Sequence, residues 1–168
     1  IKVDCLGFRR GLPHPAMILR LAKWISRAQP DIIQTWMYHA DLVGALAWSL
    51  THRAPLVWGI HSASLDPTRL KRQTRAVIGF CARLSKMPAR IVCCSEAARA
   101  AHLRLGYAPS GMEVINNGVD ADEFSPNPAA RGQIRQELGL PPEAPLVGLA
   151  ARLDPQKEHQ TFLRAAGL

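Results

Sequence analysis

The sequence predicts an α/β fold, with a doubly wound parallel sheet that carries helices on both of its faces. Two observations favour this class. Apolar runs without polar alternation, which are typical of strands buried on both faces, occur at residues 32–36, 56–60, 90–94 and 113–117. A segment with helical spacing separates each run from the next, as a crossover between parallel strands requires. The 168 residues are 48% apolar, which suffices for a packed core.

Helical spacing occupies residues 15–28, 39–50, 66–85 and 95–106. The first of these segments has one apolar face, and the third combines an apolar face with a strongly basic one. Ser95 is suited to cap the fourth helix at its start, and Gly106 is suited to end it. The last apolar run ends at Asn117 and Gly118, where we expect a positive φ.

A change in composition after Asp120 predicts a boundary between domains. The following residues are rich in Pro, Ala and charge, and predict a linker with one short helix around Gln133 to Leu138. Leu146 to Ala150 then predicts a new strand. The predicted organisation is a first domain at 1–125, a linker at 126–144 and the start of a second α/β domain at 145–168.

Ligands of open parallel sheets bind beyond the carboxyl ends of the strands. Candidate site residues therefore follow the four apolar runs, at 36–39, 61–64, 95–96 and 117–120. His61 and His39 belong to this set, although a histidine at a strand end is more often a surface or structural residue. Ser95 is interpreted first as a helix cap, and a phosphate or sugar contact is the alternative.

The composition limits the possible partners. The net charge of +8 suits nucleic acid, an anionic membrane surface or a phosphorylated small molecule. Nucleic acid is disfavoured because the sequence lacks an RNP-like aromatic strand, a zinc motif and a recognition helix. The four cysteines, Cys5, Cys81, Cys93 and Cys94, lack the spacing of a metal site, so we expect no metal. Cys93 and Cys94 lie in an apolar run, where we expect them to be small hydrophobes. No apolar stretch approaches the roughly 18 residues of a spanning helix, and we expect a soluble, cytoplasmic protein.

Arg152 and Lys157 place two cations in a loop between the predicted strand and a helix. The positive end of a helix dipole already favours anions at such a position. A diphosphate would be held by the planar guanidinium of Arg152 and the movable ammonium of Lys157. The alternative is a solvated loop with two ordinary surface cations.

Two motifs resemble those of the retaining glycosyltransferases of family 4, which belong to the GT-B group. The run NNGVDADEFSP at 116–126 fits the pattern N-G-V-D-x-x-x-F-x-P, and PLVGLAARLDPQKEHQTFLRAA at 145–166 fits [GA]-R-L-x-P-x-K. Upstream, QPDIIQTW, PLVWGIHS and IVCCSEAAR are similar to the strands of the family's first domain, with Gln34 in place of a frequent histidine. Ala151 precedes Arg152 where the family often has glycine, and Glu158 replaces the glycine that often follows the lysine.

The resemblance implies two Rossmann-like domains that face one cleft, the first binding the acceptor and the second a nucleotide-diphosphate sugar. Arg152 and Lys157 would then bind the donor's diphosphate and stabilise charge on the leaving group, without a metal or another cofactor. His61 matches the family's cleft histidine, near the transferred sugar and the acceptor, and is the catalytic candidate. Asn117, Gly118 and Asp120 would shape the crossover between the domains.

The resemblance also implies that these residues are an internal part of a longer protein, since the family's glycine-rich N-terminal loop and its E-x7-E element are not in the sequence. This part alone should bind donor weakly and turn over nothing. We expect residues 145–168 to pack on the first domain, to pair with a second copy in a homodimer, or to be partly disordered.

Family members often act on lipid-linked acceptors, in polysaccharide or lipopolysaccharide biosynthesis. The basic residues of segment 66–85 would attract an anionic membrane surface at the inner face of the membrane, or form a solvated face: Arg69, Lys71, Arg72, Arg75 and Arg83. A GT-B sugar-nucleotide 2-epimerase and a basic nucleic-acid-binding domain stay open as alternative functions.

Overall fold

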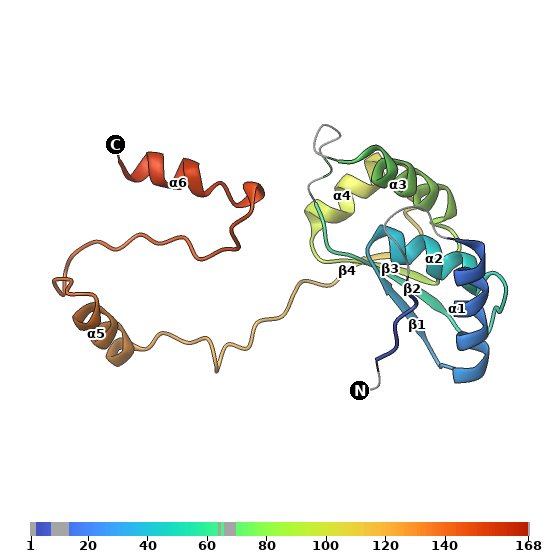
Figure 1. Ribbon diagram of the computed structural model, residues 1–168, viewed down its shortest axis with the longest axis horizontal. Helices are drawn as coiled ribbons and strands as arrows, with labels where there is room; N and C mark the ends of the chain where they lie inside the picture. Colours follow the sequence, from blue (N-terminus) through green and yellow to red (C-terminus); the bar gives the residue numbers. More distant parts are fainter. Residues whose placement is uncertain (1–2, 8–13, 64, 66–69, 168) are drawn as a thin grey trace. The chain divides into compact units, whose positions relative to one another are not determined.

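A computed structural model describes residues 3–7, 14–63, 65 and 70–167 of the chain. The chain divides into two compact units, Ile1–Gly118 and Val119–Leu168. The first unit contains α1 (Pro15–Ala28), β1 (Ile33–Trp36), α2 (Tyr38–Trp48), β2 (Leu56–Ile60), α3 (Arg72–Leu84), β3 (Arg90–Cys93), α4 (Glu96–Arg104) and β4 (Met112–Val114), as Figure 1 shows. Among the described residues, no helix combines the length and the apolar character needed to cross a membrane.

The four strands of the first unit form one parallel sheet in the order β1-β2-β3-β4. Each helix α2, α3 and α4 connects one strand to its neighbour, which is the alternation that the sequence predicts. Trp36 pairs with Gly59, Gly59 with Val92, and Val92 with Glu113, so these four residues form one row across the sheet. The α/β, Rossmann-like class is therefore confirmed.

The described helices of the first unit lie on one face of the sheet (Figure 1). Right-handed crossovers between strands in sequential order all place their helices on the same side. The strand side chains on that side are buried, above all Leu56, Trp58 and Ile60 of β2, and they pack against Val77 and Cys81 of α3. Because the predicted strands are continuous apolar runs, the sequence predicts helices on both faces of the sheet. The described residues of the first unit have helices on one of these two faces.

α2 approaches the sheet closely because it carries a glycine where it crosses β1. A Cβ atom added at Gly44 would lie 2.5 Å from Cγ2 of Thr35, too close for a side chain to fit without movement. α1 packs beside α2 through Ala22, Ile25 and Ala47, which are all buried. The sequence predicts α1 with its observed bounds, because its apolar positions follow the helical period.

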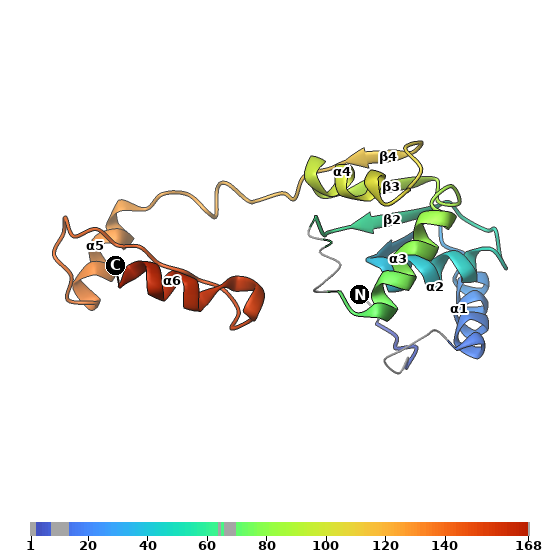
Figure 2. The same ribbon diagram turned by 90° about the horizontal axis from the view of Figure 1, so that it is seen from above.

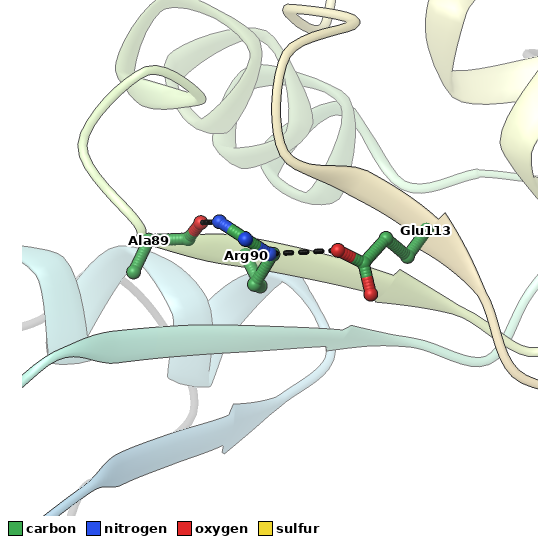
Figure 3. A network of polar contacts seen from close by, with 3 residues as sticks. All are labelled: Ala89, Arg90 and Glu113. Carbon is green, nitrogen blue, oxygen red and sulfur yellow. Dashed lines mark hydrogen bonds and ion pairs between the residues drawn. The ribbon is translucent and has the colours of Figure 1, made fainter.

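The opposite face of the sheet is more polar and more exposed. Its side chains include Gln34 and Trp36, which are exposed, and Val57 and Val92, which are half-buried. Figure 3 shows Arg90 on β3, whose Nε atom lies 2.7 Å from Oε1 of Glu113 on β4, while its Nη1 donates to the carbonyl of Ala89. Both charged side chains are more than half exposed, so this ion pair contributes little to stability.

The second unit contains α5 (Pro128–Glu137), a short 3₁₀ turn η1 (Pro155–Lys157) and α6 (His159–Ala166) (Figure 2). Asn127 caps α5 by accepting a hydrogen bond from the Ala130 N–H at 3.0 Å. Arg135 is buried and donates to the carbonyls of Pro141 and Ala144, both at 2.8 Å. These bonds fold the segment after α5 back onto the helix.

Three local predictions differ from the structure. The strand predicted at 146–150 is wrong, because these residues have no regular secondary structure and the described part of the second unit offers no strand to pair with them. Neither Asn117 nor Gly118 has a positive φ, since the chain leaves the sheet without a tight turn. β4 ends at Val114 rather than Asn117, because its neighbour β3 already gives way to α4.

Other element boundaries shift by a few residues. The helix predicted around Gln133 to Leu138 begins earlier, at Pro128, where proline fits the first helical turn. α2 begins and ends slightly before the predicted 39–50. Within the predicted basic helix the structure gives Arg72–Leu84, and Arg69 lies outside the described residues, as does Ser64 of the candidate site.

Candidate functional site

The carboxyl edge of the sheet brings Trp36 and His61 together from neighbouring strands. Trp36 is the last residue of β1, and His61 directly follows β2. Their ring centroids lie 4.7 Å apart with an angle of 41° between the planes. Both side chains are exposed, so a ligand at this edge can reach them.

The turn after Trp36 is strained. Met37 has φ 69° and ψ 158°, a region of backbone conformation that is essentially reserved for glycine. Two backbone hydrogen bonds of 2.9 Å hold it there, one from the Met37 N–H to the Gly59 carbonyl and one from the Asp41 N–H to the Met37 carbonyl. Such strain costs on the order of 1–3 kcal/mol and tends to occur at functional sites.

Asp41 lies beneath this edge, in the interface between α2 and the sheet. It is 1% exposed, and its Oδ1 accepts a hydrogen bond from the Thr35 hydroxyl at 2.5 Å. Burial raises the pKa of Asp41 to about 7, and the bond from Thr35 opposes that rise. The carboxyl is therefore protonated in a substantial fraction of molecules near neutral pH.

A buried histidine continues this polar layer. Nδ1 of His102 lies 2.7 Å from the Ala98 carbonyl, which can only accept, so Nδ1 carries the proton. Nε2 then accepts from the Tyr38 hydroxyl at 3.1 Å. Burial lowers the pKa of His102 and raises that of Tyr38 to about 12, so both side chains stay neutral. These residues support the edge from within the core and do not reach solvent.

Ser95 and the chain after β4 have structural contacts. The Ser95 hydroxyl accepts from the Ala98 N–H at 3.1 Å, which confirms it as the cap of α4. Asp120 accepts from the N–H groups of Asp122 and Glu123 through Oδ1, at 3.0 and 3.1 Å. Asn117 and Gly118 are exposed and lie where the chain passes from the first unit to the second.

Arg152 and Lys157 lie in the second unit, in the loop before α6. Both are exposed, and Lys157 ends the 3₁₀ turn, where its N–H donates to the Asp154 carbonyl at 2.9 Å. His159 Nε2 lies 2.7 Å from the Arg152 carbonyl and so ties the loop to the first turn of α6. The hollow beside this loop is lined by Leu153, Asp154, Pro155, Glu158, His159 and Gln160.

The predicted site residues thus fall into two groups. His61 belongs to the first unit, whereas Arg152 and Lys157 belong to the second. The motifs do not point to Trp36 or His159. The sequence places Trp36 only within the range 36–39 after the first strand, and the replacement of a frequent histidine by Gln34 in this strand is the available signal. Within the described residues, no group of three or more His, Cys, Asp or Glu side chains could hold a metal ion.

Known proteins resemble this chain over most of its length. It is 24% identical over 151 residues to UDP-Gal:alpha-D-GlcNAc-diphosphoundecaprenol alpha-1,3-galactosyltransferase of Escherichia coli, which covers 89% of this chain. It is 28% identical over 166 residues to GDP-mannose-dependent alpha-(1-6)-phosphatidylinositol monomannoside mannosyltransferase of Mycolicibacterium smegmatis, which covers 92% of it. The chain spans 39% of the length of each of these relatives.

A crystal structure of Anabaena Alr3699/HepE in complex with UDP-glucose matches the fold with a TM-score of 0.72 at 25% identity, over 89% of this chain and 39% of that one. The complex of the same protein with UDP gives a TM-score of 0.74 at 24% identity, over 90% and 40%. These matches agree with the parallel sheet of the first unit and with a GT-B glycosyltransferase. Residues 1–123 match the family described as Glycosyltransferase Family 4. Because this match covers well over half of the sequence, the chain belongs to glycosyltransferase family 4.

Proposed function

We propose that the protein containing this chain transfers a sugar from a nucleotide-diphosphate donor to a glycan or lipid-linked acceptor, with retention of the anomeric configuration. The observation that carries the proposal is the family match over residues 1–123. It is supported by relatives whose names state nucleotide-sugar donors and acceptors carried on diphosphoundecaprenol or phosphatidylinositol. In the transfer, the bond between the sugar and the diphosphate breaks and a bond to an acceptor hydroxyl forms.

Arg152 and Lys157 would bind the donor diphosphate. Both side chains are exposed, in a loop whose backbone is tied to α6 through His159. As the bond to the sugar breaks, negative charge grows on the diphosphate, and cations already in position stabilise it. This role needs no metal ion and no further cofactor. Glu158, at the N-cap of α6, has φ 52° and its side chain makes no cap hydrogen bond.

His61 is the catalytic candidate on the acceptor side. It is exposed at the carboxyl edge of the sheet, where ligands of parallel α/β sheets bind. We propose that the His61 side chain contacts the transferred sugar and the acceptor hydroxyl. Asn117, Gly118 and Asp120 would form the connection about which the two domains meet, with Asp120 stabilising the turn that follows.

A membrane surface is the proposed location of the acceptor. The exposed side of α3 carries Arg72, Arg75 and Arg83, and Lys71 precedes the helix. Phe80 lies on the same side, is 50% exposed, and has the Arg83 guanidinium 5.9 Å from its ring centroid. Cationic side chains beside an exposed aromatic ring suit the headgroup region of an anionic membrane. We propose peripheral attachment at the inner face, during polysaccharide or lipopolysaccharide biosynthesis.

The diphosphate assignment is testable in the full-length protein. Release of nucleoside diphosphate from UDP-glucose and from GDP-mannose is measured for Arg152→Ala and Lys157→Ala. We expect kcat/KM to fall by about 10²-fold or more for each variant, since removing one preorganised group that stabilises the transition state has effects of this size. Arg164→Ala and Lys23→Ala remove exposed cations elsewhere and should retain the parent rate.

The product distinguishes the alternatives. A nucleotide sugar recovered intact as its 2-epimer would identify an epimerase rather than a transferase. Proton NMR of a glycoside product would report the anomeric configuration, and inversion would contradict the retaining mechanism. Equal rates in the parent, Arg152→Ala and Lys157→Ala would remove the assigned diphosphate role. Sedimentation of the full-length protein would measure whether two copies associate, as the homodimer prediction requires.

A further inference from the structure

Trp36 presents a large aromatic surface to solvent. It is 54% exposed, whereas Trp58 is fully buried and Trp24 and Trp48 are half-buried. In the part of the chain that the structure describes, one surface of this ring is open to a ligand at the carboxyl edge of the sheet.

Gly59 allows the Trp36 ring to lie against the neighbouring strand. A Cβ atom at Gly59 would be 3.0 Å from Cε3 of Trp36 and 3.1 Å from the Thr35 carbonyl oxygen. Any larger residue would push the ring away from the sheet. One face of the Trp36 ring thus lies against backbone atoms, and its other face is open.

The strained backbone of Met37 fixes the same ring from the chain side. Its φ of 69° is unfavourable for a side chain with a Cβ atom, yet methionine stands there instead of glycine. The Met37 N–H is bonded to the carbonyl of Gly59, the residue beneath the ring. The position of Trp36 is therefore determined by two neighbouring strands and by the start of α2, not by a flexible loop.

The location of the ring specifies what it can bind. It contacts His61, which the proposed function assigns to the transferred sugar and the acceptor. The face of a tryptophan ring is apolar and carries negative partial charge. The C–H groups on one face of a pyranose are apolar and weakly positive, so they complement it. Trp36, Gly59 and Val92 carry no formal charge, which disfavours phosphate as the group bound against them.

We propose that Trp36 is a substrate-contacting platform, on which the pyranose ring of the acceptor stacks beside His61. The inference rests on the proposed function and assigns one part of it, the recognition of the acceptor. Gly59 and Met37 are positioning residues for the platform. With the energy of a pair of aromatic rings as the guide, we expect loss of the platform to weaken sugar binding by about 2- to 10-fold.

The test uses the full-length protein and the methyl glycosides of glucose, galactose and mannose as probes. Saturation-transfer difference NMR reports which ring protons of the glycoside contact the protein. We expect signals from one pyranose face in the parent, their loss in Trp36→Leu, and partial retention in Trp36→Phe, which keeps an aromatic face. Trp24→Leu is the matched control on α1 and should retain the signals, and circular dichroism verifies that each variant is folded.

Several results would overturn the inference. Glycoside signals that persist unchanged in Trp36→Leu would do so, as would their absence from the parent. Acrylamide quenching that is identical in the parent and Trp36→Phe would show that the ring is covered in the full-length protein. UMP serves as a second probe: loss of its base-proton signals in Trp36→Leu, with the glycoside signals unchanged, would assign the ring to a nucleobase. The release of nucleoside diphosphate is measured separately. If this release still depends on Arg152, the proposed function stands although this inference has failed.

Discussion

Asp41 is a buried carboxylic acid whose protonation contributes to stability. Burial raises its pKa to about 7 from an ordinary value of 3.8, so the folded protein holds this proton more tightly than the unfolded chain does. The resulting stabilisation is fully present below about pH 4 and is lost as pH rises through about 7. A shift of this size corresponds to about 4 kcal/mol at most, which is a large fraction of the stability of a typical domain.

Replacing Asp41 by asparagine should remove this pH dependence. Asparagine retains an oxygen that can accept from the Thr35 hydroxyl and cannot ionise. We expect the free energy of urea unfolding to fall between pH 4 and pH 8 in the parent by more than in Asp41→Asn. His102 has the opposite effect, because its lowered pKa makes stability fall as pH drops below 6.5, and comparing the two proteins cancels that contribution. Parallel pH profiles would contradict the assignment.

Single residues differ in how well their roles can be predicted from sequence. Ser95 is predictable as a cap because a serine before an apolar helical pattern has a local chemical reason to be there. Met37 could not be identified, since a positive φ at a methionine depends on the strand beside it and contradicts the ordinary preference of the residue. The same holds for His159, whose contact with the Arg152 carbonyl depends on how the loop folds.

The helix α4 provides a prediction at the scale of one element. The Ser95 hydroxyl satisfies the N–H of Ala98, one of the four donors that a helix start leaves unpaired. Ser95→Ala should lower the free energy of unfolding by about 1 kcal/mol, while Ser95→Asp should retain the cap and add a favourable charge at the helix start. Ser110→Ala, at an exposed position outside any helix, should change stability by less than about 0.5 kcal/mol. If Ser95→Ala matched this control, the cap would contribute nothing to stability.

Elements were predictable where one local signal was sufficient. β2 has its predicted bounds because Pro55 precedes its apolar run and a polar loop follows it. α1 has its predicted bounds because its apolar residues recur with the helical period. The run Leu146 to Ala150 carries an equally apolar signal but forms no strand. A strand is stable only when its backbone groups are paired, and the described part of the second unit has no strand beside this run.

At the scale of the whole molecule, the charge is distributed unevenly over the first unit. α3 turns Val77, Ile78 and Cys81 into the core, so its basic residues must face solvent. The helical period predicted this separation of faces, whereas the exposure of Phe80 among the cations required the structure. In the proposed membrane attachment, the Phe80 ring would enter the headgroup region beside these cations.

Membrane attachment through α3 predicts a strong dependence on lipid charge. The full-length protein should float with vesicles that contain phosphatidylglycerol and not with vesicles of phosphatidylcholine alone. Each cation near an anionic surface contributes about 1 kcal/mol, so Arg72→Glu combined with Arg75→Glu should lower the partition coefficient at least about 10-fold.

The matched control reverses two exposed cations of α1, Lys23→Glu and Arg27→Glu, and should bind like the parent if the surface is specific to α3. Added salt should weaken binding of the parent, because it screens exposed charges. Equal flotation with both kinds of vesicle, or an equal loss in the two double variants, would contradict attachment through α3.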